Sequence, residues 1–238
     1  MANILIVGKE LPESENLIKS FELKGHKIFT TASSEFILDN DNIFSFTWNK
    51  ASSISAKTLL IQAEAKLVQI DRVLIIFDAP NYSTKFESDR LEDCTPAVEN
   101  MVSGYLYFCQ TLLTRLSQKQ NKVTVGFYLK TASTKSTLAQ SKNITQTPCA
   151  NTVALAQGAF EALAQNMAVS LYQLPTVSVF LSISELSNSL YSDDRETGAW
   201  LSDYFDSISA LKTKQSAKSA CTWVKVGGHG PSSFPFFK

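Results

Sequence analysis

A chain of 238 residues is long enough to bury a full hydrophobic core and falls within the size range of one large α/β domain, so we expect a single domain over residues 1–238. The 22 basic residues are balanced by 22 acidic ones, which leaves no net charge to attract nucleic acid or an anionic membrane, and neither partner is expected. The four cysteines are scattered without a C-x-x-C pair, which is typical of a reducing compartment and predicts a cytoplasmic protein without a disulfide framework. The apolar run at the start is too short for a signal peptide, and no later run approaches the roughly 20 residues of a membrane span.

Apolar runs rich in β-branched and aromatic residues predict the strands of the chain. They occupy residues 4–7, 27–31, 43–48, 73–77, 123–129, 176–181 and 222–226. Helical periodicity predicts helices over residues 17–23, 58–70, 98–116 and 151–171. Because strands that alternate with helices are joined by crossovers, the pattern predicts an α/β fold, a Rossmann-type doubly wound parallel sheet of about seven strands with helices on both faces.

Other features of the sequence bear on function. Residues 131–148 are rich in Ser, Thr, Lys and Gln, which predicts a solvated surface loop, with a closing lid as the alternative. His26 and His229 lie far apart without clustered carboxylates or thiols, so no metal site is expected. Asp78 directly follows the fourth predicted strand, where this kind of fold opens its cleft. It is either a functional acid or a carboxylate bonded to the neighbouring backbone.

Five landmarks of the chain carry a likeness to a known family. They are the turn that begins at Val7 and Gly8, the helix end at Gly25, residues 70–80 (I-D-R-V-L-I-I-F-D-A-P), residues 153–157 (V-A-L-A-Q) and residues 224–228 (V-K-V-G-G). In order and spacing they resemble the short-chain dehydrogenase/reductase family over almost the whole chain. The resemblance implies a Rossmann fold and, in active members, an NAD or NADP cofactor.

The resemblance also implies positions for four catalytic groups, each of which has to be polar or ionisable. Val153 stands at the tyrosine position, Gln157 at the lysine position and Met101 at the asparagine position. The serine position falls near Lys130 or Thr131, and Thr131 could supply a residual hydroxyl. The resemblance therefore predicts a chain that is inactive as a dehydrogenase.

The phosphate-binding turn implied by the resemblance is altered as well. Pro12 and Ser14 stand at its second and third glycine positions, and proline has no N–H to offer a phosphate. Glu10, Glu13 and Glu15 surround the expected helix start, where carboxylates satisfy the helix dipole themselves and repel a phosphate. We therefore expect no cofactor, or NAD or NADP only if the cleft is still competent. The remaining candidate cofactor contacts are Gly8, Leu11, Asp78 and Ala79.

Three functions are compatible with these observations. The leading hypothesis is a non-catalytic homologue with a binding, regulatory or assembly role, for which a protein partner is a candidate. The second is an atypical NAD(P)-dependent oxidoreductase. Its replacement groups would come from Tyr105, Tyr107, Tyr128, Lys130, Lys135 and Lys142. The third is a non-catalytic subunit of a hetero-oligomer with an active short-chain dehydrogenase.

Self-association is the remaining prediction. Helix 151–171 is rich in alanine, and small residues allow close approach of a neighbouring helix. In the family this helix and the preceding one form a four-helix bundle across a two-fold axis. The resemblance therefore implies a homodimer or homotetramer through helices 98–116 and 151–171.

Overall fold

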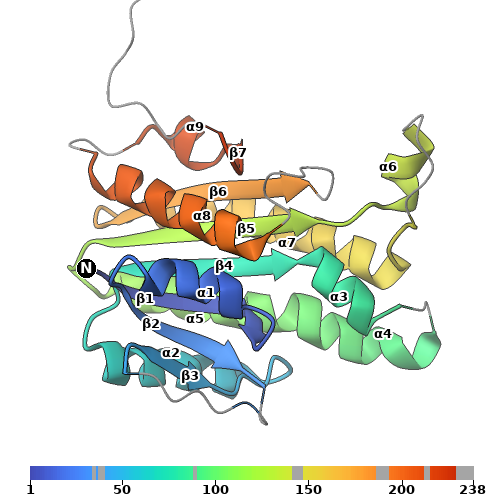
Figure 1. Ribbon diagram of the computed structural model, residues 1–238, viewed down its shortest axis with the longest axis horizontal. Helices are drawn as coiled ribbons and strands as arrows, with labels where there is room; N and C mark the ends of the chain where they lie inside the picture. Colours follow the sequence, from blue (N-terminus) through green and yellow to red (C-terminus); the bar gives the residue numbers. More distant parts are fainter. Residues whose placement is uncertain are drawn as a thin grey trace, which may run out of the picture.

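The computed structural model describes residues 1–33, 36, 41–87, 90–140, 147–185, 193–211 and 215–228. Seven strands form one parallel sheet in the order β3-β2-β1-β4-β5-β6-β7 (Figure 1). The strands are β1 (Asn3–Leu11), β2 (Lys27–Ala32), β3 (Ile43–Phe46), β4 (Arg72–Asp78), β5 (Val123–Thr131), β6 (Val177–Glu185) and β7 (Trp223–Lys225). The predicted doubly wound parallel sheet is confirmed, and each predicted strand overlaps one of these strands.

Helices cover both faces of the sheet, as predicted. The helices are α1 (Glu15–Glu22), α2 (Ser53–Leu67), α3 (Ala79–Lys85), α4 (Leu91–Val98), the π-helical segment η1 (Glu99–Ser103), α5 (Gly104–Ser117), α6 (Lys135–Gln140), α7 (Asn151–Tyr172), α8 (Asp194–Ser209) and α9 (Ala217–Ala220). In Figure 1, α1 and α8 lie in front of the sheet, and α2, α5 and α7 lie behind it. Within the described ranges, no helix is long and apolar enough to cross a membrane.

Central strand β4 shows why helices pack on both faces of the sheet. All seven of its residues are buried. Val73, Ile75 and Phe77 pack under α2, α5 and α7, whereas Leu74 and Ile76 pack under α1 and α8. Since side chains of a strand alternate between faces, a continuous apolar run is what a strand covered on both sides requires.

A bulge at Gly8 extends β1 beyond the point where the sequence predicts a turn. Pairing with β2 is interrupted after Ile6 and resumes at Leu11. Gly8 has φ +106°, and a Cβ on it would lie 2.0 Å from the carbonyl oxygen of Ile76, so this close approach of two strands requires glycine. The predicted turn after residue 7 is therefore wrong, because the strand continues to Leu11 and the turn occupies residues 12–14.

The bulge also changes which face each side chain of β1 reaches. Ile6 packs on the face under α1 and α8, and Val7 packs on the opposite face. Beyond the bulge, Leu11 lies again under α1 and α8. One extra residue shifts the alternation by one position. As a result, Lys9 reaches the face of α8, and Glu10 reaches the face of α2 and α5.

Several helix predictions need correction. The predicted helix 98–116 divides into the end of α4, η1 and α5, and α3, α9 and most of α4 were not predicted. Helix α2 begins at Ser53 instead of residue 58, because the Ser52 side chain accepts a hydrogen bond from the backbone N–H of Ser55 (3.2 Å) and caps the helix. Helix α8 is absent from the sequence-based prediction. Its mean hydropathy is low, because Ser and Asp recur along it, and its stability comes from packing against α1.

The polar segment 131–148 is more ordered than the predicted loop. Strand β5 continues to Thr131, and α6 forms over Lys135–Gln140. The loop prediction is thus wrong for this part of the segment, whereas residues 141–146 lie outside the described residues. His229 and the tail 231–238 also lie outside them.

Candidate functional site

The carboxyl edge of the sheet is where a fold of this topology places its ligands. Strand order reverses between β1 and β4, since the chain first builds outward through β2 and β3 and then returns to build β4, β5, β6 and β7 on the other side. The crevice at such a switch point is the general ligand site of open α/β sheets. The side chains at the ends of β1, β4 and β5 therefore decide what this chain can bind there.

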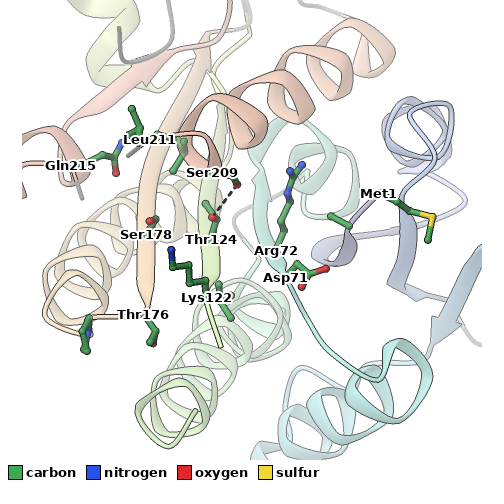
Figure 2. A pocket seen from close by; sticks show the side chains of 14 residues that line it. Met1, Asp71, Arg72, Lys122, Thr124, Thr176, Ser178, Ser209, Leu211 and Gln215 are labelled. Atoms are coloured by element: carbon green, nitrogen blue, oxygen red, sulfur yellow. Dashed lines mark hydrogen bonds between the residues drawn. The ribbon is translucent and has the colours of Figure 1, made fainter. Parts of the chain in front are cut away.

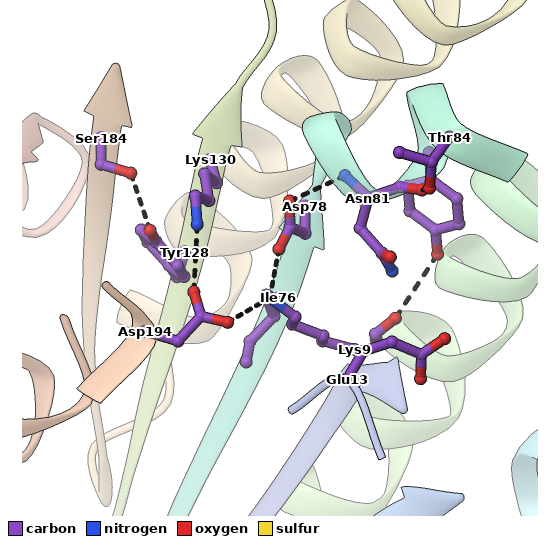
Figure 3. A network of polar contacts seen from close by, with 12 residues as sticks. Lys9, Glu13, Ile76, Asp78, Asn81, Thr84, Tyr128, Lys130, Ser184 and Asp194 are labelled. Carbon is purple, nitrogen blue, oxygen red and sulfur yellow. Dashed lines mark hydrogen bonds and ion pairs between the residues drawn. The ribbon is translucent and has the colours of Figure 1, made fainter. Parts of the chain in front are cut away.

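A network of four charged side chains spans this edge on the face of α8 (Figure 3). Lys9 Nζ donates to Asp78 Oδ2 at 2.5 Å and also to Asp194 Oδ2. Lys130 Nζ donates to the other oxygen of Asp194 at 3.0 Å. The side chains of Lys9 and Asp78 are only 7% and 5% exposed, and that of Asp194 is 16% exposed. The network thus links β1, β4 and β5 to the first residue of α8.

Strand register and helix capping place these groups. Asp78 lies directly opposite Lys130 in the β4–β5 pair. The other oxygen of Asp78, Oδ1, accepts a hydrogen bond from the backbone N–H of Asn81 (3.1 Å) and caps α3. Of the two alternatives for Asp78, the carboxylate bonded to neighbouring backbone is observed, and the ion pair with Lys9 is added to it.

The network neutralises its own charge. Burial alone would lower the pKa of Lys9, but Asp78 and Asp194 outweigh burial and raise this pKa above its ordinary value of 10.5. Burial alone would raise the pKa of Asp194, but Lys9 and then Lys130 hold this pKa below its ordinary value of 3.8. Lys9 and Asp194 are therefore charged at neutral pH, and in the network two lysines face two aspartates.

A second buried cluster fills the opposite face of the same edge. Lys50 Nζ lies 3.2 Å from Glu10 Oε1 and donates to the hydroxyl of Tyr82 at 3.0 Å. The hydroxyls of Tyr82 and Tyr105 lie 2.9 Å apart, and Tyr105 donates to the carbonyl of Ile76 at 2.7 Å. Burial, with Tyr82 beside it, raises the pKa of Tyr105 well above its ordinary value. Tyr105 therefore keeps its proton.

The glutamates of the expected phosphate turn lie in three different places. Glu10 is part of β1 and pairs with Lys50, Glu13 pairs with Lys85 (3.1 Å), and only Glu15 lies in the first turn of α1. The expectation that all three satisfy the dipole of this helix is wrong for Glu10, because the extended strand carries it to the other face of the sheet.

The candidate cofactor contacts are largely enclosed. Leu11 is 1% exposed in the core under α1 and α8, and Ala79 is fully buried as the first residue of α3. Gly8 offers its carbonyl oxygen, which accepts a hydrogen bond from Lys50 Nζ at 3.4 Å. Asp78 is committed to Lys9 and to the cap of α3.

The residues at the implied catalytic positions stabilise the fold. Val153 and Met101 are buried, at 0% and 1% exposure, on α7 and η1 respectively. Gln157 Oε1 accepts a hydrogen bond from the backbone N–H of Ala132 (2.9 Å), which ties α7 to the end of β5. The hydroxyl of Thr131 donates to the carbonyl of Ser184 at 3.2 Å, across the β5–β6 pair.

The described members of the replacement set of the oxidoreductase hypothesis do not meet at one site. Tyr128 is buried, and its hydroxyl lies 2.7 Å from Ser184 Oγ (Figure 3). Lys130 belongs to the charge network, and Lys135 is exposed on α6, where it donates to Asn151. Tyr107 is partly exposed on α5, and Lys142 lies outside the described residues. A cavity of about 460 Å³ at this edge, between α3 and the start of α7, is lined by none of the described members of this group.

Comparisons with known proteins agree with this topology. No protein-family model matches the chain, and no curated protein sequence matches it either. Among solved structures, it is similar to a short-chain dehydrogenase from Leptospira borgpetersenii with bound NAD+ (TM-score 0.61, 9% identity, 94% of this chain and 91% of that chain). It is also similar to 3-ketoacyl-(acyl-carrier-protein) reductase from Brucella melitensis complexed with NADH (TM-score 0.60, 12% identity, 94% and 96% covered).

This chain has the short-chain dehydrogenase/reductase (SDR) fold. At sequence identities this low, the similarity establishes the fold of the chain but not its activity. The activity has to be inferred from the residues of this chain. A family oxidoreductase from Aeromonas hydrophila gives the same result, with a TM-score of 0.62 and 11% identity over 91% of this chain and 94% of that chain.

Sequence reasoning missed four residues at this edge of the SDR fold. They are Lys9, Lys50, Tyr82 and Asp194. The sequence held a signal for Lys9. Lys9 and Glu10 are consecutive charged residues between Gly8 and the apolar Leu11, and this pattern is compatible with the end of a strand as well as with a turn. Lys50, Tyr82 and Asp194 carry no local signal, since their partners are distant in the sequence.

Proposed function

We propose that this chain is a non-catalytic SDR-fold protein that serves in binding or assembly, with its nucleotide cleft filled by its own side chains. The observation that carries the proposal is the buried network of Lys9, Asp78, Asp194 and Lys130 at the switch point of the sheet. Every charge in it already has an internal partner.

The residues at this edge do not fit a pyrophosphate. Such a group needs a tight glycine turn whose N–H groups face it at the start of a helix. Here β1 runs on to Leu11, and Pro12 follows it without an N–H. The carboxylates of Asp78 and Asp194 lie beside this strand end and would repel a phosphate. Freeing Lys9 for a ligand would leave the buried carboxylate of Asp78 without its ion-pair partner, which costs about 3–5 kcal/mol.

The Lys50–Tyr82 pair does not rescue an oxidoreductase function. A lysine beside a tyrosine is the combination that lowers the pKa of a proton donor. However, the side chain of Lys50 is 5% exposed and Tyr82 is 4% exposed, so the pair is closed to a substrate. A buried pair that no substrate can reach supports the proposal of a non-catalytic protein, and its side chains help to fill this edge of the sheet.

Calorimetric titration with NADH and NADPH tests this proposal. We expect no saturable heat at nucleotide concentrations up to about 1 mM, which corresponds to binding weaker than about −4 kcal/mol. The Brucella melitensis reductase, whose structure contains NADH, is the positive control. Saturable binding of either nucleotide by the wild-type chain would overturn the proposal and return the oxidoreductase hypothesis to first place.

We further propose that the chain assembles through α5 and α7. Leu106 on α5 is 42% exposed, and Leu155 on α7 is 62% exposed. A small apolar hollow of about 170 Å³ lies between the two helices, lined by Leu106, Ala159 and Leu163. Leu155, Ala159 and Leu163 recur every four residues and therefore share one face of α7. Burial against a second copy, or against an active SDR subunit, would remove this apolar surface from water.

Sedimentation velocity at about 20 µM protein tests the assembly. We expect a dimer or tetramer that dissociates in the double variant Leu106→Asp/Leu155→Asp. Ile61→Asp is the matched control, because Ile61 is 41% exposed on α2 and does not line the hollow between α5 and α7. A monomeric wild-type chain would overturn self-assembly, and co-purification of an active SDR would then support the hetero-oligomer.

A further inference from the structure

A row of polar side chains crosses the amino-terminal edge of the sheet, at the opposite end from the charge network. Arg72 pairs with Thr124 in the β4–β5 register, and Thr124 pairs with Ser178 in the β5–β6 register. Neighbouring strands lie about 4.8 Å apart, so the three side chains stand side by side. They share the face covered by α8, because Leu74 and Phe180, two residues further along β4 and β6, both pack under that helix.

A cavity of about 480 Å³ lies over this row (Figure 2). The end of α8 forms one wall with Ile208, Ser209 and Leu211. Lys122, just before β5, extends its side chain along the row toward Ser178 and Thr124 in Figure 2. The volume is in the range of small-molecule binding sites, about 300–1,000 Å³.

Hydrogen-bond donors around the cavity are left without acceptors. The side chain of Arg72 is 9% exposed; its Nη2 donates to Asp206 Oδ1 at 2.5 Å, whereas its Nη1 has no partner among the described residues. The amide nitrogen of Gln215 is also buried without a partner in this part of the chain. Buried donors are nearly always satisfied in folded proteins, so these two call for an acceptor.

One of the two cations around the cavity has no carboxylate beside it among the described residues. Lys122 is exposed and forms no ion pair with any described residue. The two carboxylates nearby are already engaged: Asp71 accepts from the backbone N–H of Asn3 and from Gln69, both at 2.9 Å, and Asp206 pairs with Arg72. Among the described residues, the hydroxyl of Thr124 has only a long contact to Ser209 Oγ (3.5 Å).

We propose that this cavity binds a phosphate group, either free or carried by a small organic molecule. Lys122 supplies a positive charge, Arg72 supplies its Nη1 donor beside the ion pair with Asp206, and Thr124, Ser178 and Gln215 supply neutral donors. A phosphate, with close to two negative charges and three acceptor oxygens, matches this set better than a carboxylate does. The cavity lies at the other end of the sheet from the charge network, so this proposal does not depend on the proposed function.

Calorimetry with three probes tests the site and separates the two sources of phosphate. The probes are inorganic phosphate, glycerol 3-phosphate and, as the uncharged control, glycerol. We expect saturable binding of at least one phosphate probe with Kd below about 1 mM. The tighter of the two probes identifies the source. Glycerol is expected to give no saturable heat.

Two surface-directed variants keep the test independent of folding. Lys122→Gln is expected to weaken binding about tenfold, since it removes a charge-assisted hydrogen bond. Ser178→Ala is expected to weaken it about threefold, since it removes a neutral donor. Lys225→Gln is the control, because Lys225 is 75% exposed and pairs with Glu185 at the other edge of the sheet. The proposal is overturned if neither phosphate probe binds, or if Lys122→Gln and Lys225→Gln bind equally well.

Discussion

Replacing Lys9 with methionine removes the cation at the centre of the charge network and keeps the length of the side chain. Asp78 then loses its ion-pair partner while its side chain remains 5% exposed, and Asp194 keeps only Lys130. Removing one partner of a buried ion pair costs about 3–5 kcal/mol. We take about 3 kcal/mol here, because Asp194 is still paired. For a chain of this size, that loss lowers Tm by roughly 6–12 °C.

Thermal melting followed by circular dichroism, together with urea unfolding, measures this loss. The matched control is Lys24→Met, since Lys24 pairs with Asp203 on the surface and that carboxylate is 74% exposed. An exposed pair contributes less than about 1 kcal/mol. Adding Asp78→Asn to Lys9→Met should restore part of the loss, because asparagine keeps the cap of α3 and removes the unpaired charge.

The pH dependence follows from the same groups. The pKa of Asp194 is lowered in the folded protein, so its contribution to stability is present above pH 3.8 and is lost as the pH falls through the folded pKa below that value. The pKa of Lys9 is raised, so its contribution is present below pH 10.5 and is lost as the pH rises beyond it. A Lys9→Met variant that is no less stable than Lys24→Met at pH 7 would refute this reasoning.

Three other predictions concern the core and its titrating groups. Gly8→Ala should destabilise the protein by more than about 2 kcal/mol in urea unfolding, because the new Cβ would meet the β4 backbone at 2.0 Å. Gly158→Ala should stabilise the protein by up to about 1 kcal/mol, because a Cβ at this helical position meets nothing within 4 Å. Burial and the nearby charge of Arg72 lower the pKa of His26, so the free energy of unfolding should rise with pH up to about pH 6.5. If the free energy of unfolding depends on pH in the same way in the wild type and in His26→Asn, this prediction is wrong. Burial raises the pKa of the Cys109 thiol to about 12, so labelling with iodoacetamide at pH 8 should modify Cys109 only after unfolding, as read by mass spectrometry of peptides.

The sequence was sufficient for the sheet because its strands carry dense apolar runs. The stretch from Val73 to Phe77 is apolar at every position, and a run of that length is typical of a strand covered on both faces. Helix α7 was also predictable, from its alanine-rich periodicity. In both cases the signal is local, so neither prediction required knowledge of a distant partner.

The charge network could not be predicted in the same way. Asp194 lies 185 residues from Lys9 in the sequence, and it is the first residue of α8, a helix absent from the sequence-based prediction. The extension of β1 was missed for a different reason. A glycine after a short apolar run is the usual sign of a turn, and its role here, close contact with Ile76, depends on a neighbouring strand.

Because of the bulge at Gly8, this edge of the protein is more sensitive to a change in the number of residues in β1 than to a change of one side chain. Inserting one residue after Gly8 would exchange the faces reached by the next two side chains, so that Glu10 would point toward Asp78 and Asp194 while Lys9 would turn toward the tyrosines. Three carboxylates would then meet where the network now balances its charge. A substitution at this edge loses one contact, but a single-residue insertion after the bulge inverts the whole electrostatic arrangement. Natural variants of this protein should therefore tolerate changes of side chain here far better than changes of spacing.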